Sequence, residues 1–298
     1  MPRPNWALLT TMTLWGYNFV AVKFVYVAMS PAALGLARFL VTWATLAAIV
    51  WGKGGSLKCP QGLGWRIAWQ GFLSMGVYMV LFLEGIARVA PGEGAILLAT
   101  SPILTAIIAA LVGQERLVAG TVVGSLTAFA GVGLVVGSGA FSGRTDVVGA
   151  GLLLASALVW AVATVISKPI MSKVPAIEMF ALSMPAAALV LVPYGVRDMV
   201  AVPWGQLSPT VWGNLFHVTF LAGLVGFVGF YRGVQRAGAS AAMLYQFLVP
   251  LLASFFAWVC LGTVMTWVQW LGVLVVLLGV GYASWSRLRA ATAKTAKS

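Results

Sequence analysis

Long apolar runs divide this chain at nearly regular intervals, and they constrain its fold more than any other feature. Each run is about 20 residues long, which is the length that an α-helix needs to cross the hydrocarbon core of a bilayer. We count ten, at residues 6–28, 32–51, 66–87, 92–112, 118–137, 147–168, 176–195, 211–232, 239–261 and 265–286. The sequence therefore predicts an all-α polytopic membrane protein with ten transmembrane helices.

The composition indicates that lipid is the solvent for most of the chain. Hydrophobic residues make up 61% of the 298 residues and charged residues only 8%, whereas soluble domains carry about 25% charged residues. The segments between the runs are short and contain turn signals, such as Ser30-Pro31 and GQER at 113–116. None of them has the size of a soluble domain, so we expect tight helical hairpins.

The distribution of basic residues predicts the orientation of the chain in the membrane. Ten spans place both termini on one side, and cytoplasmic loops are enriched in Lys and Arg. With the termini inside, thirteen of the eighteen Lys and Arg residues are cytoplasmic, and Arg88, Arg144 and Arg197 are outside. Lys23 and Arg38 lie within spans. The net charge of +12 is spread over loops and tail, so it favours anionic lipid headgroups over nucleic acid as partner.

The two halves of the chain resemble each other. A shift of 148 residues pairs Phe82 with Phe230, Gly85 with Gly233, Arg88 with Arg236, Pro102 with Pro250 and Gly124 with Gly272. We interpret residues 1–145 as a first five-helix repeat and residues 146–298 as a second repeat with a basic C-terminal tail. Five is an odd number of spans, so the second repeat must be inverted relative to the first. Inverted repeats are typical of transporters that work by alternating access.

Two similar segments, WGYNFVAVK at 15–23 and WAVATVISK at 160–168, each place a tryptophan eight residues before a lysine. Three features resemble the EamA branch of the drug/metabolite transporter superfamily. They are the segment WGYNFVAVK, the pair Pro31 and Arg38, and the segment APGEGAILLATSPILTAIIAALVGQERL at 90–117. Within that branch the chain is similar to YddG-type bacterial exporters of aromatic amino acids. The resemblance implies a transporter fold and an amino acid substrate. One departure is that Glu115, typical of the branch, has Thr263 at the repeat-related position.

Polar and aromatic residues at helical spacing are candidates for the substrate site. Thr11, Trp15 and Asn18 form one stripe, and Ser156, Trp160, Thr164 and Ser167 form another. The candidate substrate-binding residues are Trp15, Asn18, Tyr78, Phe82, Ser101, Trp160, Thr164, Phe230, Tyr231 and Gln246. Rings of this kind can stack on a planar substrate. The same residues could instead serve helix packing and interhelical hydrogen bonding.

Two prolines and a few charged groups are further candidates. Pro102 and Pro250 fall within spans, where proline removes a helical hydrogen bond, so they are candidate hinges. Lys23 and Arg38 could meet a substrate carboxylate. His217 could relay protons or form a hydrogen bond within the bundle.

The leading hypothesis is a transporter that exports small metabolites, with aromatic or neutral amino acids favoured, through a central cavity between inverted repeats. A passive channel and an exporter of cationic drugs remain alternatives. A membrane-embedded enzyme is a remote alternative, because the chain has one histidine and six acidic residues and no catalytic motif. We expect no cofactor and no metal.

The expected surroundings follow from the same features. The expected partners are a small-molecule substrate and the lipid bilayer of the bacterial inner membrane. GTVVG at 120–124 and GLVVG at 133–137 have small residues at a spacing suited to close helix packing. This spacing indicates either a homodimer surface or internal packing.

Overall fold

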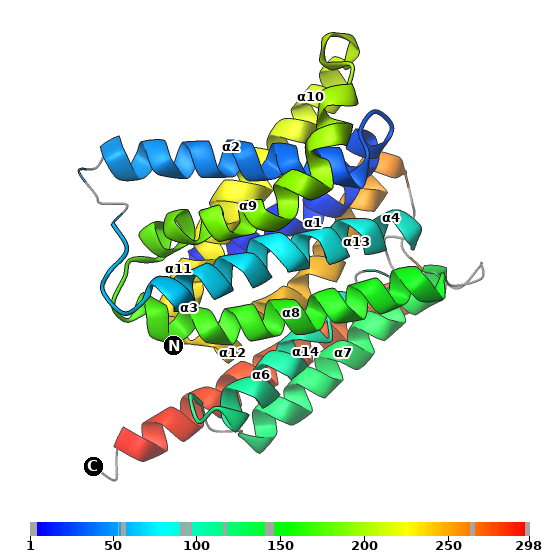
Figure 1. Cartoon of the computed structure of the whole chain (residues 1–298). Coiled ribbons are helices and arrows are strands. Elements are labelled where there is room, and N and C mark those ends of the chain that lie inside the picture. Colours follow the sequence, from blue (N-terminus) through cyan, green and yellow to red (C-terminus); the bar gives the residue numbers. More distant parts are fainter. Residues whose placement is uncertain are drawn as a thin grey trace.

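The computed structural model describes residues 5–295, apart from 53, 55–57, 90–93, 95–96, 116–117, 141–145 and 263–265. Arg144, Thr263, and residue 145 at the expected boundary between repeats lie outside the described residues. The described chain is helical, and its helices lie side by side in one bundle (Figure 1). The two chain ends lie at the same end of this bundle (Figure 1).

The helices follow the apolar runs of the sequence. Those of the first half are α1 Trp6–Tyr26, α2 Pro31–Gly52, α3 Gly64–Gly71 with η1 Phe72–Val77 and α4 Tyr78–Arg88, α6 Ser101–Leu111, and α7 Ala119–Ala140. Those of the second half are α8 Val147–Met171, α9 Ala176–Ala201, η2 Trp204–Gln206, α10 Pro209–Phe216 with η3 His217–Gly226 and α11 Phe227–Ala237, α12 Ala239–Leu244 with η4 Tyr245–Phe247 and α13 Leu248–Leu261, and α14 Trp267–Thr295.

Six helical stretches of the described chain are long and apolar enough to cross a membrane. They are Pro31–Gly52, Gly64–Arg88, Val147–Met171, Ala176–Ala201, Pro209–Ala237 and Ala239–Cys260. Three shorter apolar helices are Ser101–Leu111, Ala119–Leu134 and Trp270–Ala283. The chain is therefore a polytopic helical membrane protein, as the sequence predicts.

Polar side chains at the ends of the runs explain where several helices begin. The side chains of Asn5, Ser30, Asp146 and Ser208 each accept a hydrogen bond from the backbone N–H three residues ahead. Such caps satisfy N–H groups that the first helical turn leaves free.

The helices of the two halves interleave in the bundle. Helix α1 packs against α13 and against η3 and α11, while α8 packs against α6 and against α4 and η1. Helix α2 packs on η3 and α3 on α9. The pairs α2 with α9 and α7 with α14 each join one helix from each half.

The glycines of GTVVG serve internal packing. An added Cβ at Gly124 would lie 2.5 Å from the carbonyl oxygen of Gly279 on α14, and one at Gly120 would overlap Ser286. The α7 and α14 backbones therefore approach each other closely along this face. In GLVVG, a Cβ at Gly133 would meet nothing within 4 Å.

Two π-helical segments, η1 and η3, interrupt otherwise α-helical spans, a feature that the sequence did not predict. A π-helix changes which backbone carbonyls are free for other donors. Carbonyls in η3 accept side-chain hydrogen bonds from α1 and α2: Thr42 donates to Thr219, Trp15 to Ala222 and Thr11 to Gly226. The irregular segment is thus tied to two neighbouring helices.

Candidate substrate cavity

A cavity of about 60 Å³ lies where helices of both halves meet. It is lined by Trp15, Asn18 and Phe19 of α1, Arg38 of α2, Tyr78, Met79 and Phe82 of α4, Leu98, Ala99, Trp160 of α8, Phe227 of α11, Gln246 of η4, and Val249 and Pro250 of α13. This volume holds a few water molecules. It is well below the several hundred Å³ of a site filled by a small organic ligand.

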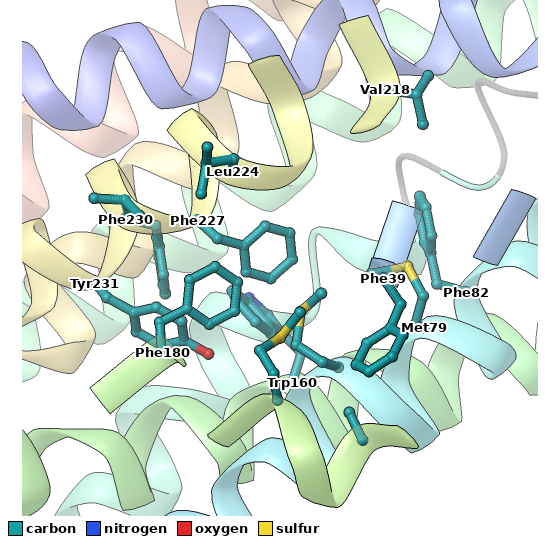
Figure 2. Packing of buried hydrophobic residues seen from close by; sticks show 14 of the residues in the cluster. Phe39, Met79, Phe82, Trp160, Phe180, Val218, Leu224, Phe227, Phe230 and Tyr231 are labelled. Carbon is teal, nitrogen blue, oxygen red and sulfur yellow. The ribbon is translucent and has the colours of Figure 1, made fainter. Parts of the chain in front are cut away.

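Trp160 is the centre of the aromatic side chains around the cavity. Its side chain is 1% exposed. Its ring centroid lies 5.9 Å from that of Trp15, 5.0 Å from Tyr78, 5.5 Å from Phe227 and 5.0 Å from Phe230. Figure 2 shows Trp160 beside Phe180, Phe227, Phe230 and Tyr231. Rings in such tilted and edge-to-face contacts stabilise one another beyond simple burial, so they form a continuous aromatic wall.

The π-helical segment fixes the orientation of Trp15. The indole Nε1–H donates to the carbonyl of Ala222 over 3.1 Å. A Cβ on Gly226 would lie only 2.6 Å from that nitrogen. One hydrogen bond therefore holds the indole ring against η3. The ring can come this close because residue 226 has no side chain.

Several buried polar atoms of the cavity residues have no hydrogen-bond partner among the described residues. They are Arg38 Nε, Asn18 Oδ1, Trp160 Nε1 and Gln246 Oε1. Arg38 is 3% exposed, and its guanidinium carbon lies 5.7 Å from the ring centroid of Phe227. Unpaired buried polar groups are costly. The residues that line the cavity therefore include both donors and acceptors without a partner among the described residues.

Phe230 and Tyr231, expected at the site, lie behind the cavity wall. Both side chains are buried but do not line the cavity. The Tyr231 hydroxyl accepts a hydrogen bond from Gln70 Nε2 over 2.6 Å, and Gln70 also donates to Ser74. Phe227 takes the position at the cavity instead. Phe227, Phe230 and Tyr231 share one face of α11, and Phe227 stands one helical turn before the other two.

Replacing Tyr231 by phenylalanine is expected to lower the free energy of unfolding by about 1–3 kcal/mol, because one N–H of Gln70 then stays buried without an acceptor. Transport should be retained, because the substituted atom does not face the cavity. Thermal unfolding of the purified protein in detergent measures the effect. The matched control is Tyr282→Phe at an exposed tyrosine, which should leave the melting temperature unchanged. Equal melting temperatures for the two variants would contradict the assignment.

Ser101 and Thr164 are also buried away from the cavity lining. Their hydroxyls have no hydrogen-bond partner in the described chain, and neither does that of Thr105. Helices α6 and α8, which carry these residues, pack together. The remaining substrate candidates, Trp15, Asn18, Tyr78, Phe82, Trp160 and Gln246, all line the cavity.

Pro102 stands at the start of a helix rather than in the middle of one, whereas Pro250 lies within the helical stretch Ala239–Cys260, shortly after a 3₁₀ turn. Pro102 lies in the first turn of α6, after a turn at residues 99–100. Pro250 follows the 3₁₀ turn η4 at the start of α13 and lines the cavity. Proline is well accommodated in a first turn, where its missing N–H has no helical partner. The α-helical geometry is thus interrupted near the cavity in both halves, by a turn before Pro102 and by the 3₁₀ turn η4 before Pro250.

The charged candidates separate into different environments. Lys23 is exposed and does not line the cavity, whereas Arg38 is buried in its wall. His217 Nε2 lies 3.0 Å from the carbonyl oxygen of Leu14, and its ring centroid lies 4.6 Å from that of Tyr17. The histidine is therefore bonded within the bundle. The described residues contain no cluster of three or more His, Cys, Asp or Glu suited to a metal ion.

Apolar lining residues escaped the sequence-based prediction. Phe19, Met79 and Leu98 line the cavity but were not among the candidates. Nothing in their type or spacing distinguishes them from ordinary packing residues of a membrane helix. Their position next to predicted residues in the same helices is the one signal that could have found them.

Comparison with known proteins supports this architecture. The model of the "EamA-like transporter family" matches residues 3–137 and 147–285. An uncharacterized transporter of Archaeoglobus fulgidus is 25% identical over 93% of this chain and 97% of its own length. A "probable terminal-alkyne amino-acid exporter" of Streptantibioticus cattleyicolor is 28% identical over 87% of this chain and 86% of its own. One solved crystal structure shares the fold, with a TM-score of 0.78 at 20% identity over 94% of this chain and 97% of its own. The chain belongs to the EamA-like transporter family.

Proposed function

We propose that this protein exports aromatic or neutral amino acids by alternating access through the ring-lined cavity. The observation that carries the proposal is the joining of Trp15, Tyr78, Trp160 and Phe227 from four helices in one cavity wall. Such rings suit a planar or apolar side chain. The relative named as a probable amino-acid exporter agrees with this class of substrate.

The proposal includes ten spans arranged as two inverted five-helix repeats, residues 1–145 and 146–298. The contacts of corresponding helices in the two halves are equivalent. Helix α1 packs on α13 as its counterpart α8 packs on α6, and η3 packs on α1 as its counterpart η1 packs on α8. The shift of 148 residues also places Phe72–Val77 within His217–Gly226. Two family matches of similar length, one in each half, support the same proposal.

The orientation is proposed from charge. Both chain ends lie at one end of the bundle (Figure 1), and the excess of Lys and Arg in the loops at that end favours the cytoplasm. Bacterial relatives such as that of Streptantibioticus cattleyicolor point to the inner membrane.

Transport requires the cavity to enlarge, because about 60 Å³ does not accommodate an amino acid with an aromatic side chain. The turn before Pro102 and the 3₁₀ turn before Pro250 supply places where the helices can bend. We propose that they act as hinges when the halves move to open the cavity to one side and then to the other.

Counterflow in proteoliposomes tests the function. Preloading with unlabelled L-tryptophan should stimulate uptake of labelled L-tryptophan by several-fold, because a carrier exchanges substrate at each return step. Empty liposomes and an equal gradient of sucrose serve as controls. A passive channel gives uptake without this stimulation, and equal competition by cationic drugs favours the drug-exporter alternative. Either result would contradict the proposal.

A further inference from the structure

Arg38 is a buried cation without a counterion among the residues that the structure describes. Two carboxylates on the neighbouring helices α4 and α9 have other partners: Glu84 accepts from the Tyr194 hydroxyl over 2.7 Å, and Asp198 accepts from Ser30 over 2.5 Å. Arginine stays protonated in proteins. A guanidinium inside a membrane protein that faces a cavity is expected to pair with an anion. No acidic side chain among the described residues pairs with Arg38, so a ligand is the candidate source of this anion.

We propose that Arg38 anchors the carboxylate of an α-amino acid substrate, while the side-chain oxygens of Asn18 and Gln246 accept hydrogen bonds from its ammonium group. This deepens the proposed function and rests on it. Guanidinium binds carboxylate through two parallel hydrogen bonds, which fixes orientation as well as charge. The three residues come from α1, α2 and η4 and line one cavity.

The amide oxygens provide the second half of the recognition. Asn18 Oδ1 and Gln246 Oε1 are buried and unpaired among the described residues. An ammonium group offers three donors, so it can satisfy both oxygens at once. With its carboxylate at Arg38 and its ammonium at these two amides, the substrate directs its side chain towards the rings around Trp160.

The charge of the cavity also selects against cationic amines. Among the described residues, its lining contains one permanent positive charge and no acidic residue. An amine that lacks a carboxylate would add a second positive charge and leave Arg38 unpaired. Repulsion between the two like charges lowers the affinity for such an amine. We therefore assign the site to zwitterions rather than to cationic drugs.

Gly223 offers an indirect way to disturb Arg38. A Cβ at Gly223, on η3, would lie 3.3 Å from Arg38 Nε and 3.1 Å from Thr42 Oγ1. Gly223 does not line the cavity. Gly223→Ala is therefore expected to move the Arg38 guanidinium without replacing any residue that lines the cavity. Gly213→Ala, in α10 of the same span, places its Cβ where nothing lies within 4 Å and is the matched control.

The test measures how strongly unlabelled L-tryptophan, tryptamine and indole-3-propionate inhibit the counterflow uptake of labelled L-tryptophan. These probes carry the same ring but differ in the charged groups. We expect inhibition in the order L-tryptophan first, indole-3-propionate second and tryptamine last. Arg38→Gln should weaken the apparent affinity for L-tryptophan by about 30-fold or more, as found on truncating one partner of a buried charged pair. Arg38→Lys should have an apparent affinity for L-tryptophan between those of the wild type and Arg38→Gln. Gly223→Ala should bind L-tryptophan more weakly than the wild type, and Gly213→Ala should bind it equally well.

Thermal stabilisation in detergent by L-tryptophan, L-leucine and indole-3-propionate separates failure of the inference from failure of the function. If L-tryptophan shows no counterflow but a carboxylate stabilises the wild type and not Arg38→Gln, the proposed function fails and the carboxylate site stands. If L-tryptophan is transported but tryptamine competes equally, or Arg38→Gln is unaffected, the inference is overturned. Stabilisation by none of the carboxylates, with no counterflow, would also overturn it.

Discussion

Replacing Trp160 by alanine is expected to reduce transport of L-tryptophan by about 30-fold or more, because a buried aromatic anchor at a binding hot spot contributes ~2 kcal/mol or more. The ring contacts Trp15, Tyr78 and Phe227 at centroid distances of 5.9, 5.0 and 5.5 Å. Removing it takes away the centre of the aromatic wall and lets the neighbouring rings reorient. Counterflow in proteoliposomes measures the effect.

The same substitution also costs stability, since truncating a buried tryptophan costs about 3–5 kcal/mol. Gel filtration and circular dichroism in detergent must therefore show that the variant is folded. Trp160→Phe retains an aromatic ring and should keep an intermediate rate. Trp270→Ala removes a tryptophan that is 59% exposed on α14 and should transport like the wild type. If folded Trp160→Ala transports normally, the cavity is not the substrate path.

Gly71→Ala is expected to produce the largest loss of stability among small substitutions. An added Cβ would overlap the carbonyl oxygen of Ser183 and lie 2.5 Å from its carbonyl carbon and 2.8 Å from its Cβ. These are largely backbone atoms of α9, which cannot turn away, so α3 and α9 must separate. Overpacking of this kind costs about 1–3 kcal/mol and occasionally more. The melting temperature and the yield of folded protein should both fall.

The control for Gly71→Ala is the same substitution at another helical glycine, where an added Cβ has room. Gly151 is exposed on α8, and its Cβ would meet nothing within 4 Å. Because alanine favours a helix over glycine by about 1 kcal/mol, Gly151→Ala should be neutral or stabilising. The two substitutions thus have opposite expected signs. A melting temperature of Gly71→Ala at or above the wild type would show that α3 and α9 are not in close contact.

The helices could be predicted from the sequence because apolar runs of bilayer length leave few alternatives to helix in lipid. Trp15, Asn18, Tyr78 and Trp160 could also be placed near a cavity, since polar and aromatic stripes avoid the lipid. All four line it. Arg38 was recognised as a substrate candidate for the same reason, because a charge within a span requires a partner.

The rest depends on backbone geometry that residue types do not reveal. Phe227, Phe230 and Tyr231 share one face of α11, yet of the three only Phe227 lines the cavity. Lys23 lies between apolar residues of a span, as a buried charge would, but its side chain is exposed. Pro102 was expected to bend a continuous helix, yet the helix restarts there. Each difference depends on how the helices pack in three dimensions, which the order of residue types does not reveal.

Accessibility of one cysteine in the cavity tests the central claim most directly. The two native cysteines are free and exposed and can be replaced by serine. Ala99→Cys then places a small thiol in the cavity wall, where Ala99 is buried. A membrane-impermeant maleimide applied to either side of the membrane should label it, and saturating L-tryptophan should slow both reactions. Labelling from one side only, at a rate that L-tryptophan does not change, would contradict an alternating-access cavity at this place.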